Sequence, residues 1–163
     1  MAISLEFQIQ PQPTLYTCGP TCLHSVYQYY GDKVGLHDVI QHTPMLEGGG
    51  TLAVMLALNA LRRGYEAKIY TYNLEVFDPT WFKKAGDVNV AERLAKQLKI
   101  KRHNRRLRAA TEAYLEFLEL GGTIGFQDLN PKLIRKYLTL SIPILTGLSA
   151  TYLYHESREL PDC

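Results

Sequence analysis

The chain has 163 residues, which suits one domain, and its 46% hydrophobic content is ordinary for a globular core. A formal net charge of +2 is too small to indicate a polyanionic partner, and the longest apolar stretch, residues 52–61, is too short to cross a bilayer. The N-terminus has no signal-peptide pattern, and three cysteines without one suggest a reducing compartment, so we expect a soluble, cytoplasmic protein without membrane contact.

The most informative segment is residues 12–23, in which a cysteine precedes a Gly-Pro step. Proline is pre-organised for the first helical position, so we predict a helix over about 20–30 with Cys18 at its N-terminal mouth. The unpaired N–H groups and the dipole there favour an anion, and the thiolate is the nucleophilic form of cysteine. Gln12, six residues upstream, has an amide that can donate a hydrogen bond to an oxyanion. Cys18 and Gln12 together indicate half of a cysteine-nucleophile active site.

Cysteines also have structural roles. Cys22 lies one helical turn after Cys18, and we expect it to be packed as a small hydrophobe. A disulfide between the two is not expected, because the helix splays their side chains. A zinc site using Cys18, Cys22 and His24 would need closer ligand spacing and a second pair of ligands far along the chain. His37 and His42 do not supply that pair, because they are interpreted as helix-surface residues. We therefore expect neither a metal nor a cofactor.

The next elements are predicted from local patterns. Residues 36–41 form a short helix, and the three glycines at 48–50 form a loop, which is either a plain turn or a wall of a substrate cleft. Thr51 can cap a helix over 52–63, which is apolar nearly all round and should be buried. Residues 66–72 alternate and are predicted as a strand.

Residues 78–140 are predicted as a helical insertion. Asn89 and Glu92 form a capping-box pattern before the first amphipathic helix. A second helix runs from about residue 104 to 120, and a third begins at the Asn130-Pro131 step.

A basic run joins the first two of these helices. Residues 96–108 hold seven Lys or Arg residues but no aromatic residue, so no stacking platform for bases accompanies them. We interpret the run as a solvated helix face and expect no nucleic-acid partner; a phosphate-binding patch and an acidic protein partner are the alternatives.

At this point the chain resembles a known family. The run from Gln12 through Cys18-Gly19-Pro20 to Tyr29-Tyr30-Gly31 is similar to the start of the bacteriocin-processing, double-glycine leader peptidases, family thirty-nine of the cysteine peptidases. Thr17 stands where the family usually has an acidic residue. The likeness covers about residues 8–75 and is expected to resume near 141–154.

The resemblance implies an α+β, papain-like fold. One peptidase domain would occupy residues 1–163, with an N-terminal helical part, the helical insertion and the first strand or strands of an antiparallel sheet. The segment 143–154 is expected to be one of these strands.

The resemblance also makes Cys18 the nucleophile and Gln12 the oxyanion-hole donor, acting on a peptide or protein substrate. The family's general base, a histidine at the start of a strand, and its orienting Asp-Pro step have no counterpart here. His155 lies nearest the expected place and is interpreted as an exposed strand-end residue; His103 is expected to be solvated.

We therefore expect a C-terminally incomplete or inactive cysteine peptidase-like protein. The alternative is a non-catalytic, peptide-binding papain-like module.

Overall fold

The computed structural model of the chain describes residues 4–82, 89–100, 103–148, 152 and 155. The structure combines helices with one small two-stranded sheet, which is compatible with the general α+β class. Within the described residues, no helix has the length and apolar character that crossing a membrane requires. The elements are α1 (Cys18–Tyr29), α2 (Leu36–Gln41), α3 (Ala53–Arg62), β1 (Lys68–Tyr70), the 3-10 helix η1 (Pro79–Phe82), α4 (Val90–Ile100), α5 (Arg105–Glu119), β2 (Thr123–Gly125) and α6 (Pro131–Thr139).

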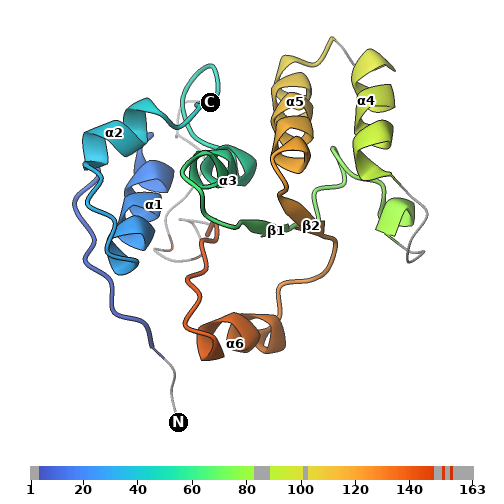
Figure 1. The fold of residues 1–163 in the computed structure, drawn as a ribbon. Coiled ribbons are helices and arrows are strands. Elements are labelled where there is room, and N and C mark those ends of the chain that lie inside the picture. Colours follow the sequence, from blue (N-terminus) through green and yellow to red (C-terminus); the bar gives the residue numbers. More distant parts are fainter. Residues whose placement is uncertain (1–3, 83–88, 101–102, 149–151, 153–154, 156–163) are drawn as a thin grey trace.

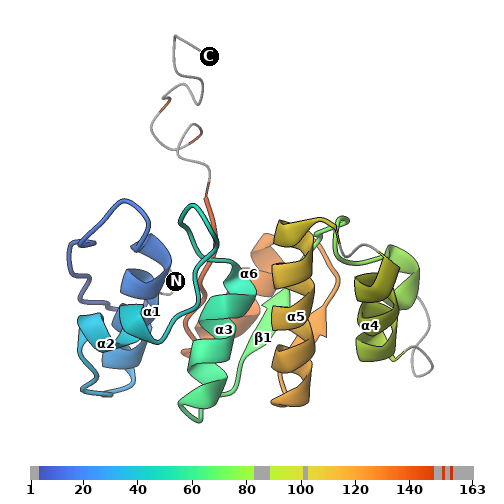
Figure 2. The same cartoon turned by 90° about the horizontal axis from the view of Figure 1, so that it is seen from above.

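The helices are arranged around the sheet. Figure 1 shows α1 and α2 on one side of the molecule, α4 and α5 on the other, and α3 between them. Seen from above in Figure 2, α3 and α5 lie in front of β1, and α6 lies behind it. The sheet is therefore enclosed between the α3–α5 layer and α6.

The two described strands pair in parallel, with Ile69 opposite Ile124. The expectation of an antiparallel sheet is therefore wrong for this pair. The chain leaves β1, forms α4 and α5, and returns as β2, and such a long helical crossover is what parallel pairing requires. The predicted strand over 66–72 is shortened to β1, and β2 is an unpredicted strand within the supposed helical insertion.

The described residues of the predicted C-terminal strand do not form a strand. Residues 143–148 have no regular secondary structure, and within the described part they make no backbone hydrogen bond to another strand. Residues 149–151 and 153–154 of the prediction lie outside the described residues. The segment after α6 returns to α1, where the Tyr29 hydroxyl donates a hydrogen bond to the Ser141 carbonyl at 3.0 Å.

Asparagine caps determine where the three later helices begin. The side chains of Asn89, Asn104 and Asn130 each accept a hydrogen bond from the backbone N–H three residues later, at 3.1, 3.0 and 2.9 Å. These bonds satisfy N–H groups that have no partner inside the helix, so the predicted starts of all three helices are confirmed.

The start of α3 differs from its prediction. Its N-cap is Leu52, in an extended conformation and without a side-chain capping bond, so the predicted Thr51 cap is wrong. Thr51 lies one residue before the cap position, and its buried hydroxyl has no hydrogen-bond partner among the described residues.

Two hydrophobic clusters form the core, and α3 contributes to both. The larger combines Val54, Met55 and Leu58 of α3 with residues of β1, α4, α5 and the segment after β1. The smaller combines Ala60 of α3 with residues of α1 and α2. Because α3 is apolar on several sides, it can be buried between the two groups of helices.

Candidate functional site

Cys18 is the first residue of α1 and is exposed. The helix begins two residues earlier than predicted, so Cys18 belongs to the first turn, where backbone N–H groups lack intrahelical acceptors. No acidic residue occupies that turn. The structure thus confirms that an exposed thiol lies at the start of a twelve-residue helix.

A compact turn leads into this helix. The buried Thr17 hydroxyl donates to the Thr14 carbonyl at 3.0 Å and accepts from the Thr14 backbone N–H at 3.1 Å. The Thr17 carbonyl in turn accepts from the Thr21 backbone N–H at 3.0 Å and from the Thr21 hydroxyl at 2.8 Å. These bonds hold the backbone on both sides of Cys18.

The glycine loop packs against the same region. Gly49 has φ +94°, and a Cβ there would lie 2.5 Å from the Tyr16 ring. A Cβ on Gly19 would meet Leu56 at 3.3 Å and Thr51 at 3.5 Å. The loop is therefore a packed neighbour of the α1 N-terminus, and its role as a cleft wall stays a prediction. The contact between Tyr16 and Gly49 was not predicted from the sequence. The run of three glycines was its signal, because a glycine lets another side chain approach the backbone closely.

Gln12 is exposed in a segment without regular secondary structure. Within the described residues, its side chain forms no hydrogen bond, and none joins it to Cys18. Its role as an oxyanion donor therefore stays a prediction.

Cys22 is exposed, so the expectation of a packed cysteine is wrong. Leu23, His24 and Tyr27 of α1 point toward the interior. Cys18 and Cys22 are four residues apart, so they share another face of the helix, and that face is exposed to solvent. Partial burial, and secondarily the charge of a Cys18 thiolate, raise the pKa of Cys22. Both cysteines are free thiols.

None of the five histidines, all of which are described, forms a hydrogen bond with Cys18. His24 is buried, and its Nε2–H donates to the Val34 carbonyl at 3.2 Å. His42 is exposed, and its Nδ1–H donates to the Asp38 carbonyl at 2.7 Å. His37, His103 and His155 are exposed, as predicted, although His155 ends no described strand. The described residues therefore do not assemble a general base at the thiol.

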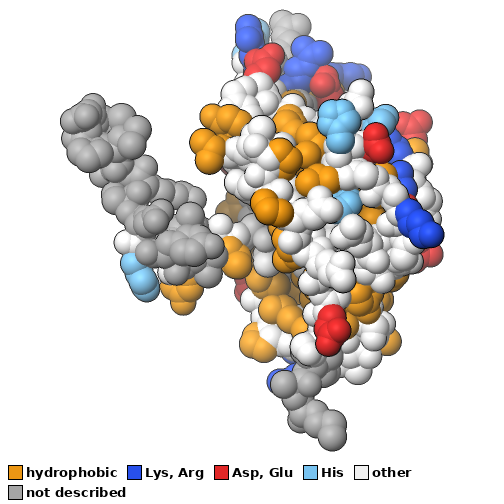
Figure 3. Space-filling view, turned by 90° about the vertical axis from the view of Figure 1, so that its left-hand side faces the viewer, with side chains coloured by type: hydrophobic (Ala, Val, Ile, Leu, Met, Phe, Trp, Pro, Cys, Tyr) orange, Lys and Arg blue, Asp and Glu red, His pale blue; other side chains and the backbone are white. Residues whose placement is uncertain are grey.

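The described residues also contain no group of three His, Cys, Asp or Glu side chains suited to holding a metal ion. Figure 3 views the side of the molecule that carries α1 and α2, and hydrophobic side chains reach that surface in several separate patches. The large hydrophobic residues exposed in the N-terminal part of the chain are Phe7, Ile9, Leu15, Tyr16, Tyr30 and Met45.

Comparison of the chain with protein-family models, curated proteins and solved structures found no match in any of the three.

Proposed function

We propose that this chain carries the nucleophile and the oxyanion donor of a papain-like cysteine peptidase site, with Cys18 and Gln12 in these roles. The observation that carries the proposal is the position of Cys18, an exposed thiol in the first turn of α1 behind a turn that is closed by its own hydrogen bonds. The resemblance of the surrounding sequence to double-glycine leader peptidases supports it further. A peptide or protein is the substrate.

The chemistry follows from these two groups. The Cys18 sulfur attacks the carbonyl carbon of a peptide bond, and a C–S bond forms as the C–N bond breaks and the leaving amine takes up a proton. Water then hydrolyses the thioester, which releases the acid and restores the thiol. The Gln12 amide and the Cys18 backbone N–H donate to the oxyanion, and losing one such donor typically slows catalysis by about 10²–10³.

A second candidate is a peptide-binding module that does not turn over. It is favoured by one observation, the absence of any histidine hydrogen-bonded to Cys18 within the described part of the chain. The first candidate predicts that an activated peptide ester acylates Cys18, whereas the second predicts peptide binding without acylation.

Thiol reactivity tests the nucleophile. We expect iodoacetamide to alkylate Cys18 faster than Cys22 at pH 7, because Cys18 lies in the first turn of α1 and burial raises the pKa of Cys22, which lowers its thiolate fraction. The measurement is the alkylation rate of each cysteine by mass spectrometry from pH 6 to 10. Cys22 is the internal control, since it is exposed on the same helix. If iodoacetamide alkylates Cys18 no faster than Cys22 and no faster than N-acetylcysteine, the enzyme proposal is wrong.

Gln12→Ala tests the oxyanion donor. We expect acylation of Cys18 by an activated peptide ester, which forms an oxyanion, to slow by about 10²–10³. Alkylation by iodoacetamide, which forms none, should keep its rate. If both reactions change equally, Gln12 acts on the thiol or on the fold and not on an oxyanion.

A further inference from the structure

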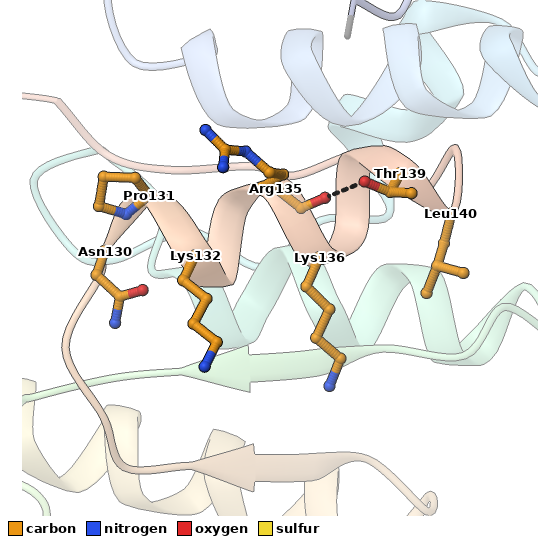
Figure 4. A pocket seen from close by; sticks show the side chains of 7 residues that line it. All are labelled: Asn130, Pro131, Lys132, Arg135, Lys136, Thr139 and Leu140. Atoms are coloured by element: carbon orange, nitrogen blue, oxygen red, sulfur yellow. Dashed lines mark hydrogen bonds between the residues drawn. The ribbon is translucent and has the colours of Figure 1, made fainter. Parts of the chain in front are cut away.

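α6 borders a groove that carries several cations. The groove has a volume of about 910 Å³, and its lining includes Lys132, Arg135 and Lys136 together with Asn130, Thr139 and Leu140. Figure 4 shows the Lys132 and Lys136 side chains pointing to one side of the helix and Arg135 to the other. None of the described residues that line this groove is acidic.

These cations have no ionic partner among the described residues. Among the described residues, no carboxylate lies within ion-pair distance of Lys132, Arg135 or Lys136, whereas Arg62, Arg63, Lys96 and Arg108 all have one. Like charges four residues apart on a helix also repel each other, so the Lys132–Lys136 pair disfavours α6. A bound anion would relieve that repulsion.

A further ammonium group, on Lys68 of β1, lies near α6 but does not line the groove. The Tyr70 and Tyr137 hydroxyls are hydrogen-bonded at 2.7 Å and join β1 to α6. Lys68 Nζ lies 5.2 Å from the centre of the Tyr70 ring, and Lys136 Nζ lies 5.5 Å from the centre of the Tyr137 ring. Lys68 and Lys136 therefore each lie over one ring of the same hydrogen-bonded tyrosine pair.

The geometry favours an acidic peptide over a nucleic acid. The two tyrosine rings meet edge-on at 61°, and each has an ammonium group over its face, so neither offers a free stacking surface for a base. Lys132 and Lys136 lie about 6 Å apart along the helix, from a rise of 1.5 Å per residue. Alternate side chains of an extended peptide are spaced by about 6.7 Å. Two carboxylates separated by one residue therefore match the lysine pair.

The ends of the helix indicate what should flank these carboxylates. Leu129 and Leu140, on either side of α6, are 60% and 61% exposed. We propose that the groove along α6 is a docking site for an extended acidic segment of a protein partner, with two acidic residues in alternation and apolar residues beside them. This proposal is independent of the chemistry at Cys18.

The test is fluorescence anisotropy of the full chain with a labelled peptide, Leu-Glu-Ala-Glu-Leu. We expect binding that weakens at least tenfold when both glutamates are replaced by glutamine, and that weakens as salt is added. The charge-reversal pair Lys132→Glu and Lys136→Glu should weaken it at least tenfold. The matched control is Lys99→Glu with Arg106→Glu, the same charge change on the exposed surface of α4 and α5, and it should keep the affinity within twofold.

The single variant Lys132→Glu separates binding from folding. It places a carboxylate four residues before Lys136, a favourable arrangement on a helix, so the urea midpoint should be retained or raised while peptide binding falls. The proposal is overturned by equal binding of the glutamine peptide or by an equal loss in the Lys99/Arg106 control. Tighter binding of anionic lipid vesicles or of an oligonucleotide to α6 would overturn it as well.

Discussion

At the level of single residues, a buried chain of hydrogen bonds links α1, α2 and α3. The Tyr27 hydroxyl donates to Asn59 Oδ1 at 2.6 Å, and Asn59 Nδ2 donates to the Thr43 hydroxyl at 3.1 Å. That hydroxyl donates to the Val39 carbonyl at 2.6 Å. All four residues are buried, so each polar group depends on its partner in the chain.

Tyr27→Phe should lower the free energy of unfolding by about 1–3 kcal/mol, because it leaves Asn59 Oδ1 buried without its donor. The measurement is urea unfolding followed by far-UV circular dichroism. Tyr29→Phe is the matched control, since it removes an exposed hydrogen bond and should change stability by less than about 0.5 kcal/mol. Equal effects of the two changes would contradict the role of the buried chain.

At the level of elements, one carboxylate joins the ends of α1 and α3. Asp32 follows α1 and accepts from the Arg63 guanidinium at 2.5 Å, from the Tyr65 hydroxyl at 3.2 Å and from the Val34 backbone N–H at 3.2 Å. The Arg63 hydrogen bond is the main reason that the pKa of Asp32 lies below its usual value. Arg63 also lies over the Tyr27 ring, 5.1 Å from its centre.

Asp32→Asn should destabilise the protein at pH 7 by about 0.5–1 kcal/mol, a small value because both side chains of the pair are partly exposed. A lowered carboxyl pKa stabilises the fold above the pKa of the unfolded chain, and this contribution is lost as pH falls through the folded pKa. The difference between the two proteins should therefore vanish in acid. Urea unfolding from pH 7 to pH 2 measures it, and a difference that persists in acid would contradict the ion pair as its cause.

At the level of the whole molecule, α3 makes the two hydrophobic clusters one folding unit. Leu58 is 1% exposed in the larger cluster, and Ala60, two residues later, belongs to the smaller one. Trp81 is the one tryptophan of the chain and packs against the larger cluster, so its fluorescence reports on that side of α3.

Leu58→Ala should lower the free energy of unfolding by about 2–5 kcal/mol, because it leaves a cavity within the larger cluster. Trp81 fluorescence and far-UV circular dichroism should still change at the same urea concentration, as in a two-state transition. Leu74→Ala, at a position that is 66% exposed, is the control and should change stability by less than about 0.5 kcal/mol. A Trp81 transition well before the circular-dichroism transition would show that the clusters unfold separately.

Local patterns were sufficient for most helices. α2 spans the predicted residues, and α5 lies within its predicted ends. The periodicity of apolar residues and, for α5, the asparagine cap are local properties of the sequence, so they could be recognised without the structure. The start of α1 was predicted less closely, since Thr17 is held by its turn and the helix begins at Cys18 before the proline.

The features that local patterns did not predict depend on contacts between segments distant in the sequence. β2 is three residues long and exists because residues 123–125 meet β1 across two intervening helices, a pairing that no local alternation signals. Cys22 is exposed because the opposite face of α1 packs on α2 and α3. Leu52, and not Thr51, occupies the N-cap position of α3. The sequence therefore sufficed to place a cysteine at a helix start. The surroundings of that thiol, including the packed glycine loop and the distribution of the histidines, follow from packing between segments far apart in the chain.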